Sequence, residues 1–115
     1  MSDTCIFCRI VAGAIPANIV YQDELITAFH DIDPKAPTHV LVIPNRHLES
    51  LAETGPQDAA LLGHLFSRVP AIAAALGLAP AGYRVVVNVG RDAGMAVYHL
   101  HVHILGGRRL AWPPG

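Results

Sequence analysis

The sequence predicts an α+β fold in which helices cover an antiparallel sheet of about five strands. Two observations support this prediction. Short segments rich in β-branched and aromatic residues are separated by tight turns, and two stretches with helical spacing, one long and one short, stand apart from them. The 115 residues are 52% hydrophobic and contain no internal repeat, so we expect a single domain over residues 1–115.

Two segments place their apolar residues at helical spacing. The short one spans residues 5–11 and is stopped by Gly13, and the long one spans residues 56–76 and has a proline in its first turn. Pro70 lies inside the long segment. Because an interior proline removes a backbone donor, we expect a kink between residues 66 and 70. His64, in the same segment, is expected to be a surface residue.

The predicted strands are short and bounded by turn residues. Gln22-Asp23 is a plausible tight turn between the first two strands, a proline-containing connection over residues 31–37 leads to the third, and a glycine-bearing loop over residues 90–97 joins the last two. The expected strands span residues 17–21, 24–30, 38–43, 83–89 and 98–105.

The charge distribution excludes two classes of partner. The formal net charge is −1 and no block of like charges occurs, so the features of a nucleic-acid binder or of a protein that binds anionic membranes are missing. No apolar run approaches the roughly 18 residues of a membrane helix, and the first residues do not resemble an export signal. We therefore expect a cytoplasmic protein with neither nucleic acid nor membrane as a partner.

Three histidines alternate along the last predicted strand. His99, His101 and His103 would share one face. The consistently apolar opposite face would consist of Tyr98, Leu100, Val102 and Ile104. The alternatives to a functional role are that these histidines form a solvated polar face or that their spacing arose by chance. Neighbouring rings would lie roughly 6.6 Å apart and the outer two roughly 13 Å apart, so one phosphate cannot contact all three. We expect His101 to act as nucleophile and His103 to supply a proton or hydrogen bond.

These residues and their surroundings resemble the histidine triad (HIT) superfamily, in particular its nucleotide-binding branch. The run from His99 to Leu105 is followed by Gly106-Gly107-Arg108, and the sequence ends in Trp112-Pro-Pro-Gly115. Further motifs occur in the expected order: Phe7 with Ile10, Ile15-Pro16, Phe29-His30-Asp31-Ile32, Ala36-Pro37-Thr38-His39, Val42-Ile43-Pro44 and Asn88.

The resemblance implies a set of catalytic residues and a site for a purine nucleotide. His101 matches the nucleophile that forms a nucleotidyl-histidine intermediate, which water later hydrolyses. The catalytic set it implies is His39, His99, His101 and His103. The nucleotide-binding set it implies is Phe7, Ile10, Phe29, His30, Asp31, Ile32, Asn88, Gly94, Ala96, Val97, His101, His103 and Trp112.

Within this nucleotide-binding set, the resemblance assigns separate tasks. Asp31 would accept the ribose hydroxyls, Asn88 and His103 would contact phosphate, and Trp112 would come from the neighbouring subunit of a homodimer whose sheets form one continuous larger sheet. The base slot would be formed by Phe7, Ile10, Phe29 and Ile32. Read without the resemblance, the apolar residues are ordinary core, while Asp31 and Asn88 are ordinary turn residues.

A second site is predicted around the two cysteines. The spacing of Cys5 and Cys8, without an export signal, favours a metal or redox pair over a structural disulfide. With His47 and His99 they make a four-ligand sulfur and nitrogen set suited to structural zinc, which some HIT relatives bind through such residues. The alternative is that both cysteines are small buried hydrophobes. We expect no organic cofactor.

Two adjacent positions depart from the branch, whose members usually carry a glutamine and then a serine or threonine where this sequence has Met95-Ala96. The missing hydroxyl predicts slow or altered turnover. We expect a homodimeric hydrolase or transferase acting on purine nucleoside phosphoramidates or related adenylyl compounds. The alternatives are a dinucleoside polyphosphate hydrolase, a nucleotide-binding regulatory or adaptor protein with vestigial catalysis, and a metal-binding module that uses the three histidines.

Overall fold

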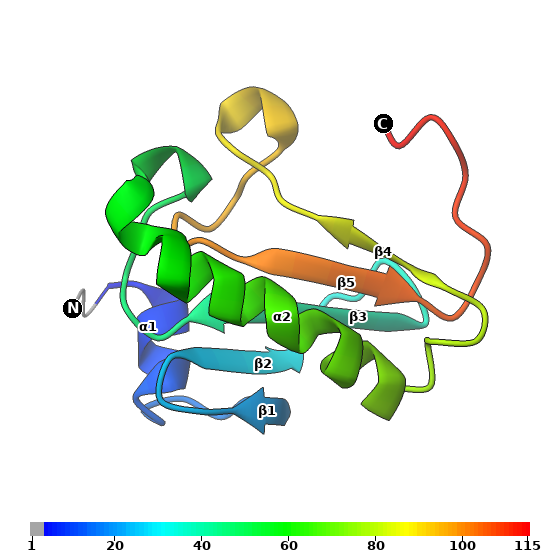
Figure 1. The fold of residues 1–115 in the computed structure, drawn as a ribbon, viewed down its shortest axis with the longest axis horizontal. Coiled ribbons are helices and arrows are strands. Elements are labelled where there is room, and N and C mark those ends of the chain that lie inside the picture. Colours follow the sequence, from blue (N-terminus) through cyan, green and yellow to red (C-terminus); the bar gives the residue numbers. More distant parts are fainter. Residues whose placement is uncertain (1–3) are drawn as a thin grey trace.

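The structure, a computed structural model, describes residues 4–115. Residues 1–3, which contributed to the expectation about an export signal, lie outside the described residues. The predicted α+β fold is confirmed: five antiparallel strands form one sheet in the order β1-β2-β3-β5-β4, and the long helix α2 lies across it (Figure 1). The elements are α1 (Ile6–Val11), β1 (Ile19–Gln22), β2 (Ile26–His30), β3 (Thr38–Pro44), α2 (Ala59–Ala75), β4 (Tyr83–Val86) and β5 (Val102–Gly106).

The central strand β3 is buried on both faces of the sheet. Val40 and Val42 belong to the hydrophobic cluster that α2 covers, whereas Leu41 and Ile43 belong to a second cluster with residues of α1. All four side chains are at most 5% exposed. Because side chains alternate along a strand, this pattern assigns one helix to each face. The helix α1 therefore defines the face on which the histidines gather.

The last strand begins later than predicted. The interpretation of residues 98–105 as one strand is wrong for its first four residues, because β5 begins at Val102. The backbone N–H of Leu100 donates to the carbonyl of Leu48 at 2.7 Å, and the ring of His99 turns toward the carbonyl of Pro44. Tyr98, placed on the apolar face by the prediction, is instead 47% exposed. Phe7 of α1 nevertheless contacts the rings of both His99 and His101.

Other boundaries shift by a few residues. The strand predicted for residues 83–89 ends at Val86, and the turn between β1 and β2 lies at residues 23–25 rather than at Gln22-Asp23. The long helical segment opens with a 3-10 turn, Pro56–Asp58, and α2 continues through Pro70 to Ala75. The kink near Pro70 stays a prediction. Within residues 4–115, none of the helices has the length and apolar character needed to cross a membrane.

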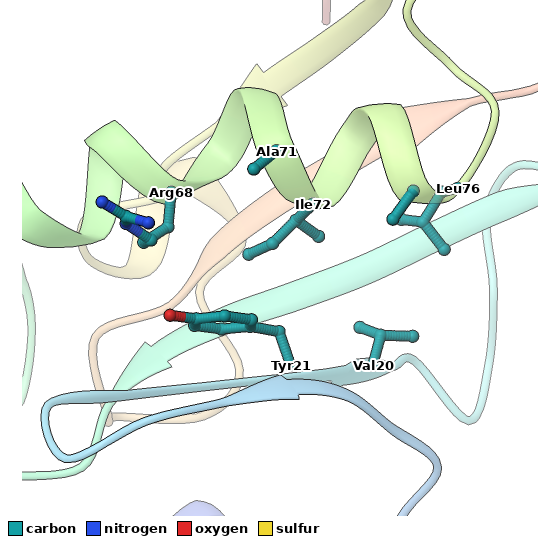
Figure 2. A pocket seen from close by; sticks show the side chains of 7 residues that line it. Val20, Tyr21, Arg68, Ala71, Ile72 and Leu76 are labelled. Carbon is teal, nitrogen blue, oxygen red and sulfur yellow. The ribbon is translucent and has the colours of Figure 1, made fainter.

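A small groove separates α2 from the edge strand β1, on the face of the sheet opposite α1 (Figure 2). Its volume is about 240 Å³, and the guanidinium of Arg68 and the phenol of Tyr21 lie at one end of an otherwise apolar lining. The lining residues are Val20, Tyr21, Arg68, Ala71, Ile72, Ala75 and Leu76. The groove is thus separate from His101 and His103, which line a different cavity on the other face of the sheet.

The carboxylate of Asp23 joins the β1–β2 turn to α2. Its Oδ1 accepts the backbone N–H groups of Leu25 and Ile26 at 2.8 and 2.9 Å, and its Oδ2 accepts the Tyr21 hydroxyl and the Nε2–H of His64, both at 2.7 Å. Burial opposes ionisation, but the hydrogen bonds from Tyr21, the Leu25 backbone and His64 outweigh it and lower the pKa of Asp23 well below its usual range. His64 is therefore a structural partner rather than a free surface residue.

Replacing Asp23 with asparagine should lower the free energy of unfolding at pH 7 by about 2–3 kcal/mol, because donors would be left without their acceptor. Since the folded pKa is depressed, this stabilisation is present above the unfolded pKa of about 3.9 and is lost as the pH falls below it. Urea unfolding of both proteins at pH 7 and pH 3.5 checks this. Asp92→Asn, an exposed control, should be neutral, and an equal effect of both substitutions would contradict the prediction.

Candidate active site

A cavity of about 630 Å³ opens between α1, the α1 face of β2 and β3, and the loop that precedes β5. Every residue predicted to bind the nucleotide lines it except Trp112. Those residues are Phe7, Ile10, Phe29, His30, Asp31, Ile32, Asn88, Gly94, Ala96, Val97, His101 and His103. Phe7 and Phe29 pack edge to face with centroids 5.4 Å apart, whereas Ile32 is fully exposed at the rim. The cavity thus combines an apolar wall with histidine, carboxylate and amide groups.

Sequence reasoning missed some of the lining. Leu41 pairs with His103 across β3 and β5 and faces the same side. The signal that could have identified Leu41 is the alternation of side chains along β3: Leu41 must point to the face opposite Val40 and Val42, which α2 covers. Ile6 lies in α1, and the other missed residues lie in the irregular segment before β1. In that segment no periodicity indicates which way a side chain points. The missed lining residues are Ile6, Ile15, Pro16, Ala17, Asn18 and Leu41.

Trp112 lies away from the cavity of its own chain. Its side chain is 79% exposed, and the guanidinium of Arg84 lies 5.8 Å from its ring centroid. Arg84 also donates to the carbonyl of Ala111 at 2.9 Å, so the tail is held beside β4. The assignment of Trp112 to the site of a neighbouring subunit stays a prediction.

The ring of His101 is held in one orientation. Its Nδ1 lies 2.7 Å from the carbonyl oxygen of His99, and because a carbonyl only accepts, His101 donates the Nδ1 proton. In the neutral ring, Nε2 then carries a lone pair. The side chain is 7% exposed, lines the cavity and packs edge to face against Phe7 at 5.3 Å. In its neutral form, His101 therefore presents an Nε2 lone pair with the properties of a nucleophile.

The hydrogen bonds of His39 fix the tautomer of His103. The backbone N–H of Lys35 donates to His39 Nδ1 at 3.0 Å, which leaves the proton of a neutral His39 on Nε2. That Nε2–H donates to His103 Nδ1 at 2.9 Å. A neutral His103 must then carry its own proton on Nε2, a buried atom that has no hydrogen-bond partner among residues 4–115. The result is a donor available to a bound group.

Burial keeps His103 neutral at physiological pH. Removal from water is the main reason that the pKa of His103 falls to about 4; the rings of His101 and His39 act in the same direction whenever they are protonated, and the Asp31 carboxylate opposes them. Burial also lowers the pKa of His39, while the Asp31 carboxylate partly opposes this change. Both rings therefore remain uncharged near pH 7, as the tautomers deduced above require.

The depressed pKa of His103 should make the protein less stable in mild acid. Between the folded pKa of about 4 and an unfolded value of about 6.5, the unfolded state binds more protons, so stability falls as the pH is lowered. We expect a loss of about 1–2 kcal/mol from this residue between pH 7 and pH 5. Unfolding curves of wild type and His103→Asn check it: the variant should show a shallower pH dependence, and parallel profiles would contradict the assignment.

A second cluster joins α1 to the residues before β5. Cys5 caps α1, Cys8 lies within it, and the two cysteines do not form a disulfide. His99 donates Nε2–H to the carbonyl of Pro44 at 2.8 Å, so its Nδ1 lone pair faces the sulfurs. His99 Nδ1 lies 3.3 Å from Cys5 Sγ and 3.5 Å from Cys8 Sγ. His47 Nδ1 lies 3.3 Å from Cys8 Sγ and 3.2 Å from His99 Nδ1.

These distances match the edges of a tetrahedral zinc site. With Zn–S of about 2.3 Å and Zn–N of about 2.05 Å, the edges would be about 3.6 Å between sulfur and nitrogen and about 3.3 Å between two nitrogens. All four ligand atoms lie within 4.8 Å of one another. The four residues predicted as ligands therefore meet in one place and fit a structural zinc ion.

The fold, with His30, His101 and His103 lining one cavity, defines a small α+β protein with a histidine-lined pocket. The HIT domain family model matches residues 12–110, and the chain belongs to the HIT family. It is 54% identical, over the full length of both chains, to an uncharacterized HIT-like protein from Synechococcus elongatus. A HIT family hydrolase from Legionella pneumophila superposes with a TM-score of 0.95 at 46% identity, covering 97% of this chain and 100% of its own.

A histidine triad protein from Clostridium difficile superposes with a TM-score of 0.93 at 40% identity, covering 96% of each chain. The predicted membership of the HIT superfamily is thereby confirmed. The chain is a HIT-family hydrolase-like protein.

Proposed function

We propose that this protein hydrolyses purine nucleoside phosphoramidates or related adenylyl compounds through a nucleotidyl-histidine intermediate on His101. The observation that carries the proposal is the pair of tautomers in the cavity. An unprotonated His101 Nε2 and an unpartnered His103 Nε2–H belong to neighbouring rings, whose centroids are 5.0 Å apart. A nucleophile and a donor for the phosphoryl oxygens are the two groups that nucleotidyl transfer requires.

The reaction has two balanced steps. His101 Nε2 attacks the α-phosphorus and the bond from phosphorus to nitrogen breaks, so that the amine leaves with a proton from solvent. Water then attacks the same phosphorus and releases a proton to solvent, the bond to His101 breaks, and the nucleoside monophosphate leaves. In both steps the His103 Nε2–H would donate to the oxygen on which charge develops.

The cavity also suits the nucleoside part of the substrate. Its volume of about 630 Å³ lies within the usual range for small-molecule sites. Asp31 lines the cavity and its side chain is 21% exposed, so its carboxylate can accept ribose hydroxyls. Phe7 and Phe29 supply apolar ring surface for a base without groups that read its edge. This arrangement supports a purine nucleotide without distinguishing adenine from guanine.

We further propose that Cys5, Cys8, His47 and His99 hold a structural zinc ion. When bound, zinc would cross-link α1 to the segment before β5 and contribute no step of the reaction. Because His99 supplies the carbonyl that orients His101, the ligands also maintain the position of the nucleophile.

A homodimer is proposed through the free edge of the sheet. The strand β4 is paired on one side only, with β5, and its Val85 is 38% exposed. A second copy pairing with this edge would continue the sheet and cover part of the apolar surface. The tail that carries Trp112 lies beside the same strand, bonded to Arg84.

Two substrate classes separate this proposal from its alternatives. Chromatographic assay of an adenosine phosphoramidate beside a dinucleoside polyphosphate should show faster AMP release from the phosphoramidate. The reverse order would favour a dinucleoside polyphosphate hydrolase. Binding of AMP without hydrolysis of either compound would favour a regulatory nucleotide-binding protein.

Ala96→Ser should increase turnover. Ala96 is exposed on the cavity wall, and a serine hydroxyl there would add a hydrogen bond near the phosphate or the leaving group. If that bond forms in the transition state, it contributes about 1.5–3 kcal/mol, or about one to two powers of ten in rate. Steady-state kcat of both proteins measures the gain. Ala93→Ser, in the same loop but outside the cavity lining, is the control, and equal rates for all three proteins would contradict the prediction.

A further inference from the structure

Successive contacts join Asp31, at the predicted ribose position, through His39 to His103, the proposed phosphate donor. Asp31 Oδ1 accepts the backbone N–H of Asp33 at 2.8 Å, which holds the carboxylate in place. Asp31 Oδ2 lies 3.5 Å from His39 Nε2, and the same nitrogen lies 2.9 Å from His103 Nδ1. His39 is only 4% exposed. One proton, on His39 Nε2, therefore faces two acceptors.

We infer that His39 is a positioning residue that couples occupancy of the ribose subsite to the hydrogen bonding of His103. The inference rests on the proposed function, because it assumes that nucleotide hydroxyls bind Asp31. With the carboxylate free, its charge attracts the His39 Nε2 proton away from His103. When the ribose hydroxyls donate to Asp31 Oδ2, the carboxylate attracts the His39 Nε2 proton less strongly. That proton is then donated more fully to His103 Nδ1.

The consequence is that ribose hydroxyls assist the reaction as well as binding. A stronger bond from His39 Nε2–H holds His103 Nδ1 as an acceptor and keeps the proton of His103 on Nε2, where it can donate to the phosphate. A hydrogen bond that strengthens only in the transition state, when His103 donates to the phosphate, raises the rate at saturating substrate rather than the affinity for substrate. A substrate without ribose hydroxyls should therefore react slowly even when bound.

The first test compares single-turnover rates at saturating substrate for an adenosine phosphoramidate and its 2′,3′-dideoxy analogue. In wild type we expect the dideoxy rate to be lower by about tenfold, the effect of one hydrogen bond. In Asp31→Asn and His39→Leu the ratio of the two rates should approach one. His39→Gln should restore part of the ratio, because its amide can donate to His103. Asp33→Asn, the same chemical change two residues away, should keep the wild-type ratio.

The second test does not depend on turnover. Nitrogen-15 NMR of histidine-labelled protein should show the His39 Nε2 and His103 Nδ1 resonances shifting when AMP binds, and shifting less with 2′,3′-dideoxy-AMP. The difference should disappear in Asp31→Asn. If AMP binds but no substrate reacts, the proposed hydrolysis fails and this spectrum alone decides the coupling.

Three results would overturn the inference. One is a wild-type ratio near one, with the hydroxyls changing only the substrate affinity. Another is an unchanged ratio in His39→Leu, which would mean that the hydroxyls act by a route other than His39. The third is an identical NMR response to AMP and its dideoxy analogue. Failure of AMP to bind at all would overturn both the inference and the proposed function.

Discussion

Replacing His101 with alanine should abolish turnover and leave the fold intact. Wild type mixed with an adenosine phosphoramidate should gain the mass of one AMP unit within milliseconds to seconds and then lose it, whereas the variant should show no gain. Loss of a nucleophile leaves only the contribution of the remaining site, so we expect the rate to fall by at least about 10⁴-fold. Rapid-quench intact-mass measurement checks both results.

The comparison needs a histidine outside the site. His64→Ala removes a histidine that contacts Asp23 on the opposite side of the sheet, and it should form the adduct at the wild-type rate. AMP binding to His101→Ala, measured by calorimetry, shows whether the cavity remains intact. An adduct of the same mass on His101→Ala would assign the nucleophile to another residue.

Removal of the proposed zinc ion should lower the stability of the fold substantially. If the site is saturated at about 1,000 times its dissociation constant, the bound ion stabilises the fold by about 4 kcal/mol. For a domain of this size, that corresponds to a melting temperature higher by about 15 °C. A strong chelator should therefore lower the melting temperature of wild type by this amount, and Cys8→Ala should show the lower value without chelator.

Metal analysis and a combined experiment make this prediction specific. Wild type purified without chelator should contain about one zinc per chain, the number that the four-ligand cluster can hold. Adding chelator to Cys8→Ala should cause no further loss of stability. Wild type without zinc, and with a melting temperature insensitive to chelator, would support the alternative in which both cysteines are ordinary buried side chains.

Periodicity predicted those parts of the fold that local spacing determines. The segment rich in β-branched residues over residues 38–43 identified β3, and helical spacing identified both helices. Most of the cavity lining was also predicted, through motifs carried by these elements and by the resemblance. Assignment of each lining residue to a bound nucleotide stays a prediction.

The errors arose where distant residues determine the local backbone. Leu100 bonds to Leu48, and His99 turns to Pro44, which is 55 positions away, so the histidine segment leaves the regular strand before Val102. The bond between His39 and His103 spans 64 positions, and no spacing rule indicates it. The same holds for His64, whose partner Asp23 lies 41 positions earlier.

The position of β3 in the sheet affects how the chain is made by a ribosome. β3 pairs with β2 and with β5, and β2 precedes it directly, whereas β5 follows after a long helix, a loop and β4. Until β5 has been synthesised, β3 exposes an unpaired edge, a feature that promotes aggregation. Because β5 also carries His103, the nascent chain completes its proposed catalytic set and loses this edge at the same stage of synthesis.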